Sequence, residues 1–137
     1  MSADQISAVR KRIRELHDEM GRLLEGFLKR APLLKGCVYE SRHRCGKSGC
    51  ACARGALHVA TVLAYRGQGK QRNRHPAGRE LVLVRQMTSD YQRFRRARAR
   101  LVKAFQELLG QVALLERERV AEGERRFRTT DTGRCLR

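Results

Sequence analysis

Apolar residues recur every three or four positions in two long stretches of the chain. This spacing places them along one face of an α-helix, with polar residues on the other faces. The pattern therefore predicts helices over residues 3–31 and 77–121. The repeat in the first stretch consists of Ile6, Val9, Ile13, Leu16, Met20, Leu23 and Phe27. In the second it consists of Val84, Met87, Tyr91, Phe94, Leu101, Phe105, Leu108, Val112 and Leu115, with Arg98 where another apolar residue is due.

The alternation of three and four is the heptad repeat of coiled coils, so each helix needs a partner for its apolar face. Because a compact segment joins the two helices, an antiparallel coiled-coil-like hairpin is the simplest arrangement. A parallel dimer through one helix is the alternative. Arg98 would pair with Glu15 or Glu19 in the hairpin, or mark the end of the seam. The end of the longer helix beyond its partner is free to pair with a second copy, giving a homodimer through the helices.

Between the helices, residues 33–76 have a different pattern. β-branched and aromatic residues alternate there between glycine-containing turns, which predicts short antiparallel strands. One strand leads into Cys45, a second covers about 58–66 and a third about 70–74. The predicted fold is α+β, mainly α, with residues 1–137 as a single domain. Residues 122–137 show no periodicity and are predicted to be a disordered basic tail.

A candidate metal site lies in the β-rich insert. Zinc in structural sites takes four ligands, usually thiolates and imidazoles, and the insert offers Cys45, Cys50, Cys52 and His58. Gly46 and Gly49 would permit the tight turns around an ion. A bound zinc would also stabilise a sheet that has few apolar residues of its own. The alternatives are reduced thiols without an ion, and a different fourth ligand; the reserve ligands are Cys37, His43 and His75.

Charge is the strongest compositional signal. The chain has 31 Lys+Arg against 14 Asp+Glu, a net charge of +17, which favours polyanionic partners such as DNA or RNA. No Asp or Glu occurs from Ser41 to Arg79. A second basic group follows the later helix on the face predicted to lie opposite its apolar seam. The predicted nucleic-acid contacts are Arg42, Arg44, Lys47, Arg54, Arg72, Arg74, Arg93, Arg96, Arg100 and Lys103.

Three sequence runs resemble a family of short, basic, uncharacterised bacterial proteins. They are R-C-G-K-S-G-C-A-C-A-R-G at residues 44–55, P-L-L-K-G at 32–36 and Y-Q-R-F-R at 91–95. The family pattern is R-C-G-K-x-x-C-x-C-A-x-G followed by a histidine, and its recurrent ligand-type residues correspond to Cys45, Cys50, Cys52 and His58. Family members are often encoded near transposases, which implies a mobile-element setting. Here V-A-T follows the histidine where the family has Gly-Pro-Tyr.

These observations predict a small, zinc-stabilised nucleic-acid-binding accessory protein acting with a recombinase or transposase. The alternative is a coiled-coil adaptor that binds other proteins and has no direct nucleic-acid role. We do not expect an enzyme, because no carboxylate lies near the cysteines and the four predicted ligands leave no open position on a zinc ion. The lack of a long apolar run and of a signal peptide predicts a cytoplasmic protein without membrane attachment.

Overall fold

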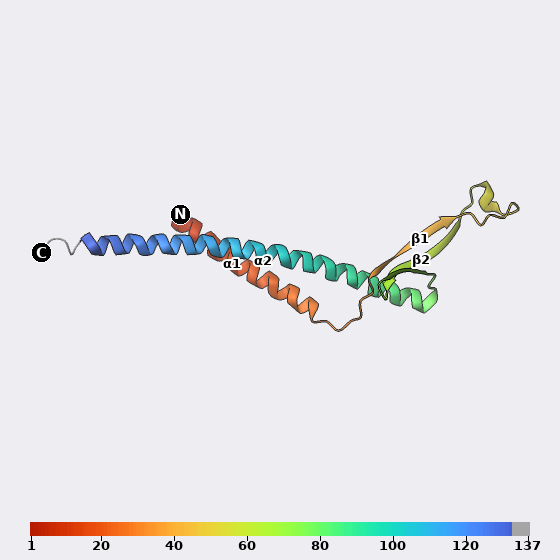
Figure 1. Cartoon of the computed structure of the whole chain (residues 1–137), viewed down its shortest axis with the longest axis horizontal. Helices are drawn as coiled ribbons and strands as arrows, with labels where there is room; N and C mark the ends of the chain where they lie inside the picture. The colour runs from red at the N-terminus through yellow and green to blue at the C-terminus, as the bar shows by residue number, and fades with distance from the viewer. Residues whose placement is uncertain (133–137) are drawn as a thin grey trace. The chain divides into compact units, whose positions relative to one another are not determined.

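The computed structural model describes residues 1–132 (Figure 1). Its elements are α1 (Ala3–Phe27), β1 (Gly36–His43), the 3-10 helix η1 (Ala51–Arg54), β2 (His58–Gly67), β3 (Lys70–Arg74) and α2 (Gly78–Thr132). The protein is therefore α+β and mainly helical, as predicted, with a three-stranded antiparallel sheet. Across the described residues, neither helix has an apolar stretch long enough to cross a bilayer.

The chain divides into two compact units. The helical unit comprises Met1–Leu28 and Ala97–Arg137, and the sheet unit comprises Lys29–Arg96. Because α2 runs from Gly78 to Thr132, it contributes residues to both units.

A capping box begins α1. The side chain of Ser2 accepts a hydrogen bond from the Gln5 amide at 3.2 Å, and the Gln5 side chain accepts one from the Ser2 amide at 2.7 Å. The helix ends at Phe27, earlier than the predicted residue 31. Gly26 weakens its last turn, and the residue before Pro32 is disfavoured in helical geometry.

The inner face of α1 follows the predicted repeat, with Val9 and Leu16 buried. On α2, the inner face of the helical unit differs from the prediction by one position. Ala104 is fully buried, whereas the predicted seam residues Phe105 and Val112 are exposed. The sequence pattern favoured the larger apolar residues as seam positions. A small alanine is buried instead because it leaves room for a neighbouring helix to pack closely, and a pattern of apolar positions does not distinguish residues by size.

Ion pairs join α1 to the part of α2 in the same unit. Arg12 donates twice to Glu107, at 2.6 and 3.0 Å, and Arg100 donates twice to Glu19, with Nη2 2.7 Å from Oε2. Later positions on α1 thus pair with earlier positions on α2. The predicted partner of Glu19, Arg98, is exposed instead. Arg100, two positions further along α2, forms the ion pair with Glu19 that the heptad pattern had assigned to Arg98.

Helix α2 continues to Thr132, so the prediction of a disordered tail from residue 122 is wrong for the described part. Ion pairs within the helix support this last stretch. Arg125 contacts Glu118 at 3.1 Å and Glu122 at 2.8 Å, and Arg126 contacts Glu122 at 2.7 Å. Side chains three or four positions apart are neighbours on a helix, so charged residues can sustain it without an apolar period. Residues 133–137 of the predicted tail lie outside the described residues.

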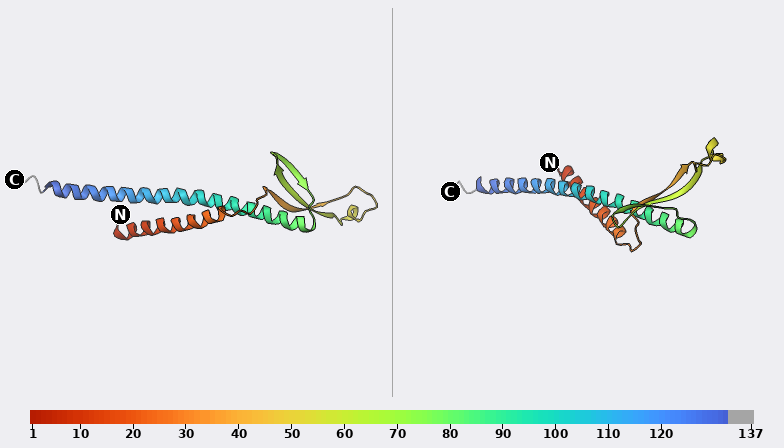
Figure 2. Two further views of the ribbon diagram at one scale, coloured as in Figure 1. Left: turned by 90° about the horizontal axis from the view of Figure 1, so that it is seen from below. Right: turned by 45° about the vertical axis from the view of Figure 1, so that its right-hand side comes forward.

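The three strands occur where they were predicted and follow one another in the sheet (Figure 2). β1 pairs with β2 from Gly36↔Tyr65 to His43↔His58, and β2 pairs with β3 from Leu63↔Arg74 to Gly67↔Lys70. Gln68 and Gly69 both have positive φ in the β2–β3 turn, a backbone conformation typical of two-residue hairpin turns.

The sheet unit has buried residues on both β2 and α2. Val62 and Leu63 of β2 are buried, as are Val84 and Thr88 of α2. The Leu34 amide, just before β1, donates a hydrogen bond to the Met87 carbonyl of α2 at 3.2 Å. The sheet unit therefore buries several side chains on β2 and α2, which the sequence alone did not predict.

Candidate metal centre

The predicted ligands gather where the β1–β2 pairing stops. The last strand pair is His43↔His58, and residues 44–57 form the loop that contains η1 (yellow in Figure 1). Cys45, Cys50 and Cys52 lie on this loop. Because His58 begins β2, the sheet register brings the imidazole back to the same end of the hairpin as the cysteines.

Two glycines shape the loop around the cysteines. Gly46 follows the first cysteine with φ +79°, and Gly55 ends η1 with φ +107° and donates its amide hydrogen bond to the Cys52 carbonyl at 3.3 Å. Side chains rarely adopt such φ values, so both positions favour glycine. Gly49 was predicted to take the same role but has no positive φ.

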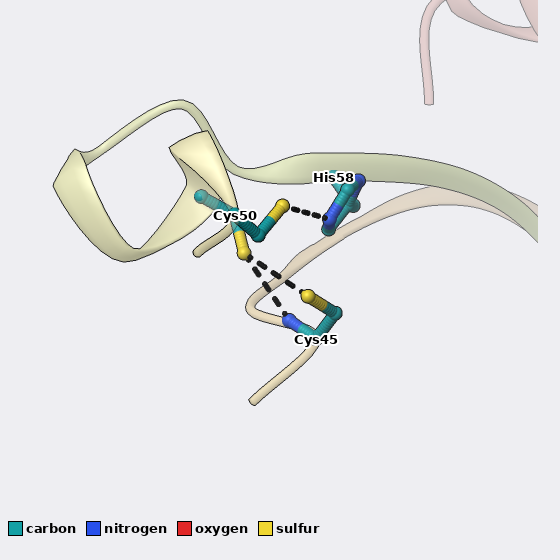
Figure 3. A group of neighbouring side chains, drawn as sticks. Cys45, Cys50 and His58 are labelled. Atoms are coloured by element: carbon teal, nitrogen blue, oxygen red, sulfur yellow. Dashed lines mark hydrogen bonds between the residues drawn. The ribbon is translucent and has the colours of Figure 1, made fainter. Parts of the chain in front are cut away.

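The four ligand atoms form a compact cluster. One donor atom from each of Cys45, Cys50, Cys52 and His58 lies within 4.8 Å of all the others. The Sγ atoms of Cys45 and Cys52 are 3.4 Å apart, and Cys50 Sγ is 3.2 Å from His58 Nε2 (Figure 3). These sulfurs are too distant for a disulfide, whose bond is about 2.05 Å. A tetrahedral zinc with bonds of about 2.3 Å to sulfur would separate its sulfurs by about 3.8 Å, so the cluster has a suitable size.

Hydrogen bonds in the cluster favour thiolates at two positions. The pKa of Cys45 is lowered to about 6, mainly by the Lys47 amide and then by His58. The pKa of Cys50 is lowered, mainly by the Cys52 amide. The Cys45 amide lowers the pKa of Cys52, but burial and the neighbouring sulfurs outweigh it, so that this pKa is raised. Contacts with Cys45 and then Cys50 raise the pKa of His58. Thiolate is the form that binds metal.

The reserve ligands lie outside the cluster. Cys37 is exposed on β1 and His75 is exposed after β3. His43 is nearer, with its ring centroid 5.8 Å from that of His58, but its nitrogens do not belong to the group of four. The geometry therefore favours His58 as the fourth ligand.

The predicted basic contacts fall into two groups. Arg74 pairs with Glu80 at 2.8 Å, Arg93 lies 3.7 Å from Asp90, and Arg100 pairs with Glu19 on the inner face of the helical unit. The heptad pattern had placed Arg100 on the outer face of α2, and the structure places it on the inner face instead. The other predicted contacts are exposed, with no acidic partner within residues 1–132: Arg42, Arg44, Lys47, Arg54, Arg72, Arg96 and Lys103.

Sequence reasoning missed the backbone donors of the site. The Cys45 amide donates to Cys52 Sγ at 3.4 Å, and the Lys47 and Cys52 amides lower the pKa values of Cys45 and Cys50. No side-chain pattern signals such donors, because every residue except proline has an amide. Comparison with family models, curated proteins and solved structures finds no match to this chain. The case for the site therefore rests on its residues and geometry.

Proposed function

We propose that this chain is a small zinc-stabilised nucleic-acid-binding protein. The gathering of Cys45, Cys50, Cys52 and His58 at one end of the β1–β2 hairpin is the observation that carries the zinc site, and the exposed cations around it support nucleic-acid binding. Three thiolates and one imidazole form a complete ligand set for a structural zinc ion. Such a site leaves no open position for water or substrate, so the role of the metal is structural and the protein is not an enzyme.

Zinc would fix a loop that packing alone holds weakly. Within residues 44–57, Cys52 is buried and the other residues are exposed or partly exposed. A metal ion bound to three loop cysteines and to the first residue of β2 would close the loop onto the strands. Small modules with little apolar core commonly depend on a metal in this way.

Cations of the loop and of the adjoining end of β1 have no acidic partner within residues 1–132. Arg42, Arg44, Lys47 and Arg54 flank the ligands, are exposed and have no acidic partner within residues 1–132. The sheet unit has 16 Lys and Arg against three Asp and Glu, a net charge of +13. Exposed cations without acidic partners are suited to phosphate groups, where charge neutralisation provides most of the affinity. Bound zinc would hold these side chains in a fixed arrangement.

We infer that the helical unit is an antiparallel hairpin of the coiled-coil type. The opposite order of the Arg12–Glu107 and Glu19–Arg100 pairs along the two helices supports this arrangement. In this proposal the helices carry the basic module and provide contacts to other proteins. A recombinase or transposase is the partner expected from the sequence resemblance.

The nucleic-acid proposal is tested by measuring affinity for double-stranded DNA, single-stranded DNA and RNA over a salt series, with zinc-loaded protein. We expect log Kd to depend steeply on log salt concentration. Replacing Arg42, Arg44, Lys47 and Arg54 by Gln should lower that slope by about 0.9 for each contact to double-stranded DNA that is lost.

A matched control removes four exposed arginines of the helical unit, none of which forms an ion pair within residues 1–132. These are Arg14, Arg22, Arg117 and Arg119, each replaced by Gln. We expect the control to keep a slope close to that of the unmodified protein. An equal loss in both variants would mean that the charge acts generically. Weak binding that disappears near physiological salt would favour the protein adaptor instead.

A further inference from the structure

A second apolar stripe runs along α2 within the helical unit. It consists of Val102, Phe105, Leu109 and Val112, which are 51%, 50%, 54% and 45% exposed. Their spacing of three, four and three residues places them on one helix face. The inner face, with Ala104 fully buried, is a different one. We call these four residues the outer stripe. It is a heptad seam without a partner in the described chain.

The outer stripe ends in opposite charges. Arg98 lies four residues before Val102, and Glu116 lies four residues after Val112, so both continue the same face. Both side chains are exposed, and neither has an ion-pair partner within residues 1–132. This arrangement differs from that of Arg100 and Glu107, which are paired with α1.

The stripe is complementary to itself when one copy is reversed. Arg98 and Glu116 are equally distant from position 107, as are Val102 and Val112, and Phe105 and Leu109. A two-fold axis near position 107 would therefore place Arg98 opposite the partner's Glu116 and Phe105 opposite the partner's Leu109. In a two-fold interface each such contact occurs twice. A parallel arrangement would instead bring like charges together at both ends.

We propose that the outer stripe is the interface of an antiparallel homodimer. Beside the stripe lie Ala99, Gln106 and Ala113, which are uncharged, and the two alanines are small enough to allow two helices to approach closely. The helical unit has a net charge of +4, whereas the sheet unit has +13, so repulsion between copies is weakest on this unit. The occupant is a second copy, because both the charges and the apolar side chains match when the stripe is reversed upon itself, whereas a parallel copy would place like charges together.

Charge reversal tests both the dimer and its direction. Sedimentation equilibrium of the zinc-loaded full chain should show a dimer of 15.7 kDa chains. R98E and E116R should each weaken dimerisation by about tenfold, since each creates two like-charge contacts per dimer. The double variant R98E/E116R should return to within about threefold of the unmodified protein. R117E, which reverses an exposed charge away from the stripe, should change little.

A second variant tests the apolar contact. F105Q should weaken dimerisation by more than about tenfold, because a central aromatic residue is lost twice. V82Q is the matched control, since Val82 is 70% exposed on α2 but lies in the sheet unit. Both side chains are exposed, so circular dichroism should show unchanged helicity.

Three results would overturn the proposal. The first is a monomer at every concentration tested. The second is equal dimerisation of the unmodified protein, both single charge variants and the double variant, which would indicate a parallel or unrelated interface. The third is equal dimerisation of F105Q and the unmodified protein. None of these results bears on nucleic-acid binding, so this proposal can fail independently of the proposed function.

Discussion

The two units of this protein use charge in opposite ways. The helical unit has 15 Lys and Arg against 11 Asp and Glu, and it places Arg12 and Arg100 in ion pairs with carboxylates of the facing helix. The sheet unit has 16 Lys and Arg against three Asp and Glu, and several of these cations have no acidic partner among the described residues 1–132. Arginine side chains therefore form ion pairs between helices in the helical unit, whereas in the sheet unit many basic side chains are free to contact an anionic ligand.

The units also differ in what stabilises them. Leu16 and Ala104 are fully buried in the helical unit, where apolar contact and ion pairs act together. The sheet unit buries Val62 and Leu63 of β2, but the cysteine loop lies beyond the last strand pair. We therefore expect the helical unit to respond to changes in packing and pH, and the loop to respond to metal.

Metal removal should give the largest difference between the units. We expect a strong chelator, or C52S, to abolish amide protection and protease resistance in residues 44–58 while most of the helical circular dichroism remains. Apparent zinc affinities of zinc-finger peptides are about 10–16 kcal/mol, so loss of the ion is a large perturbation for so small a loop.

The control for this prediction is C37S, because Cys37 is exposed on β1 and lies outside the ligand cluster. It should retain one zinc ion per chain, measured by elemental analysis. Unchanged protease resistance of the loop after complete removal of metal would rule out a structural role for zinc.

Core truncation should give the next largest effect, confined to the helical unit. We expect L16A to lower the free energy of unfolding by about 2–5 kcal/mol, because Leu16 is fully buried. The zinc content should be unchanged. L24A is the matched control, since Leu24 is 49% exposed on the same helix, and it should cost less than about 0.5 kcal/mol. Similar losses in the two variants, measured by denaturant unfolding, would contradict the packing described for α1.

The fold was predictable where apolar residues alone define a face. On α1, the three-four repeat through Val9 and Leu16 predicted the buried face correctly. On α2 it did not, because the inner face contains the small residue Ala104 and the charged residues Arg100 and Glu107. A hydrophobic pattern favours Phe105 over Ala104 as the buried residue. The alanine is buried instead, because only a small side chain fits beside a neighbouring helix.

The cysteines of the candidate metal site were predictable from the sequence, but the strand pairing that positions the histidine was not. The spacing of Cys45, Cys50 and Cys52 identified a cluster, and the structure gathers these residues. The choice between His43 and His58 depends on strand pairing, since the two histidines are opposite each other at the end of the hairpin. Spacing along the chain cannot determine which imidazole then reaches the sulfurs.

The smallest predicted effect is a dependence of the helical unit on acid. Arg100 lowers the pKa of Glu19 through a hydrogen bond, and Arg12 does the same for Glu107. A carboxyl group with a lower pKa in the folded state binds protons more readily when unfolded. These pairs therefore stabilise the folded state above the carboxyl pKa of the unfolded chain, near 4.5, and this stability is lost as the pH falls below it.

The acid dependence should be measured by denaturant unfolding of the C52S variant between pH 7 and pH 3, so that release of metal does not contribute. We expect E19Q/E107Q to be less stable at pH 7 and to lose less stability on acidification. E25Q, at an exposed position without an ion pair within residues 1–132, should retain the original pH dependence. The effect should be modest because the paired side chains are partly exposed. A pH dependence in E19Q/E107Q equal to that of E25Q would show that these pairs do not stabilise the helical unit.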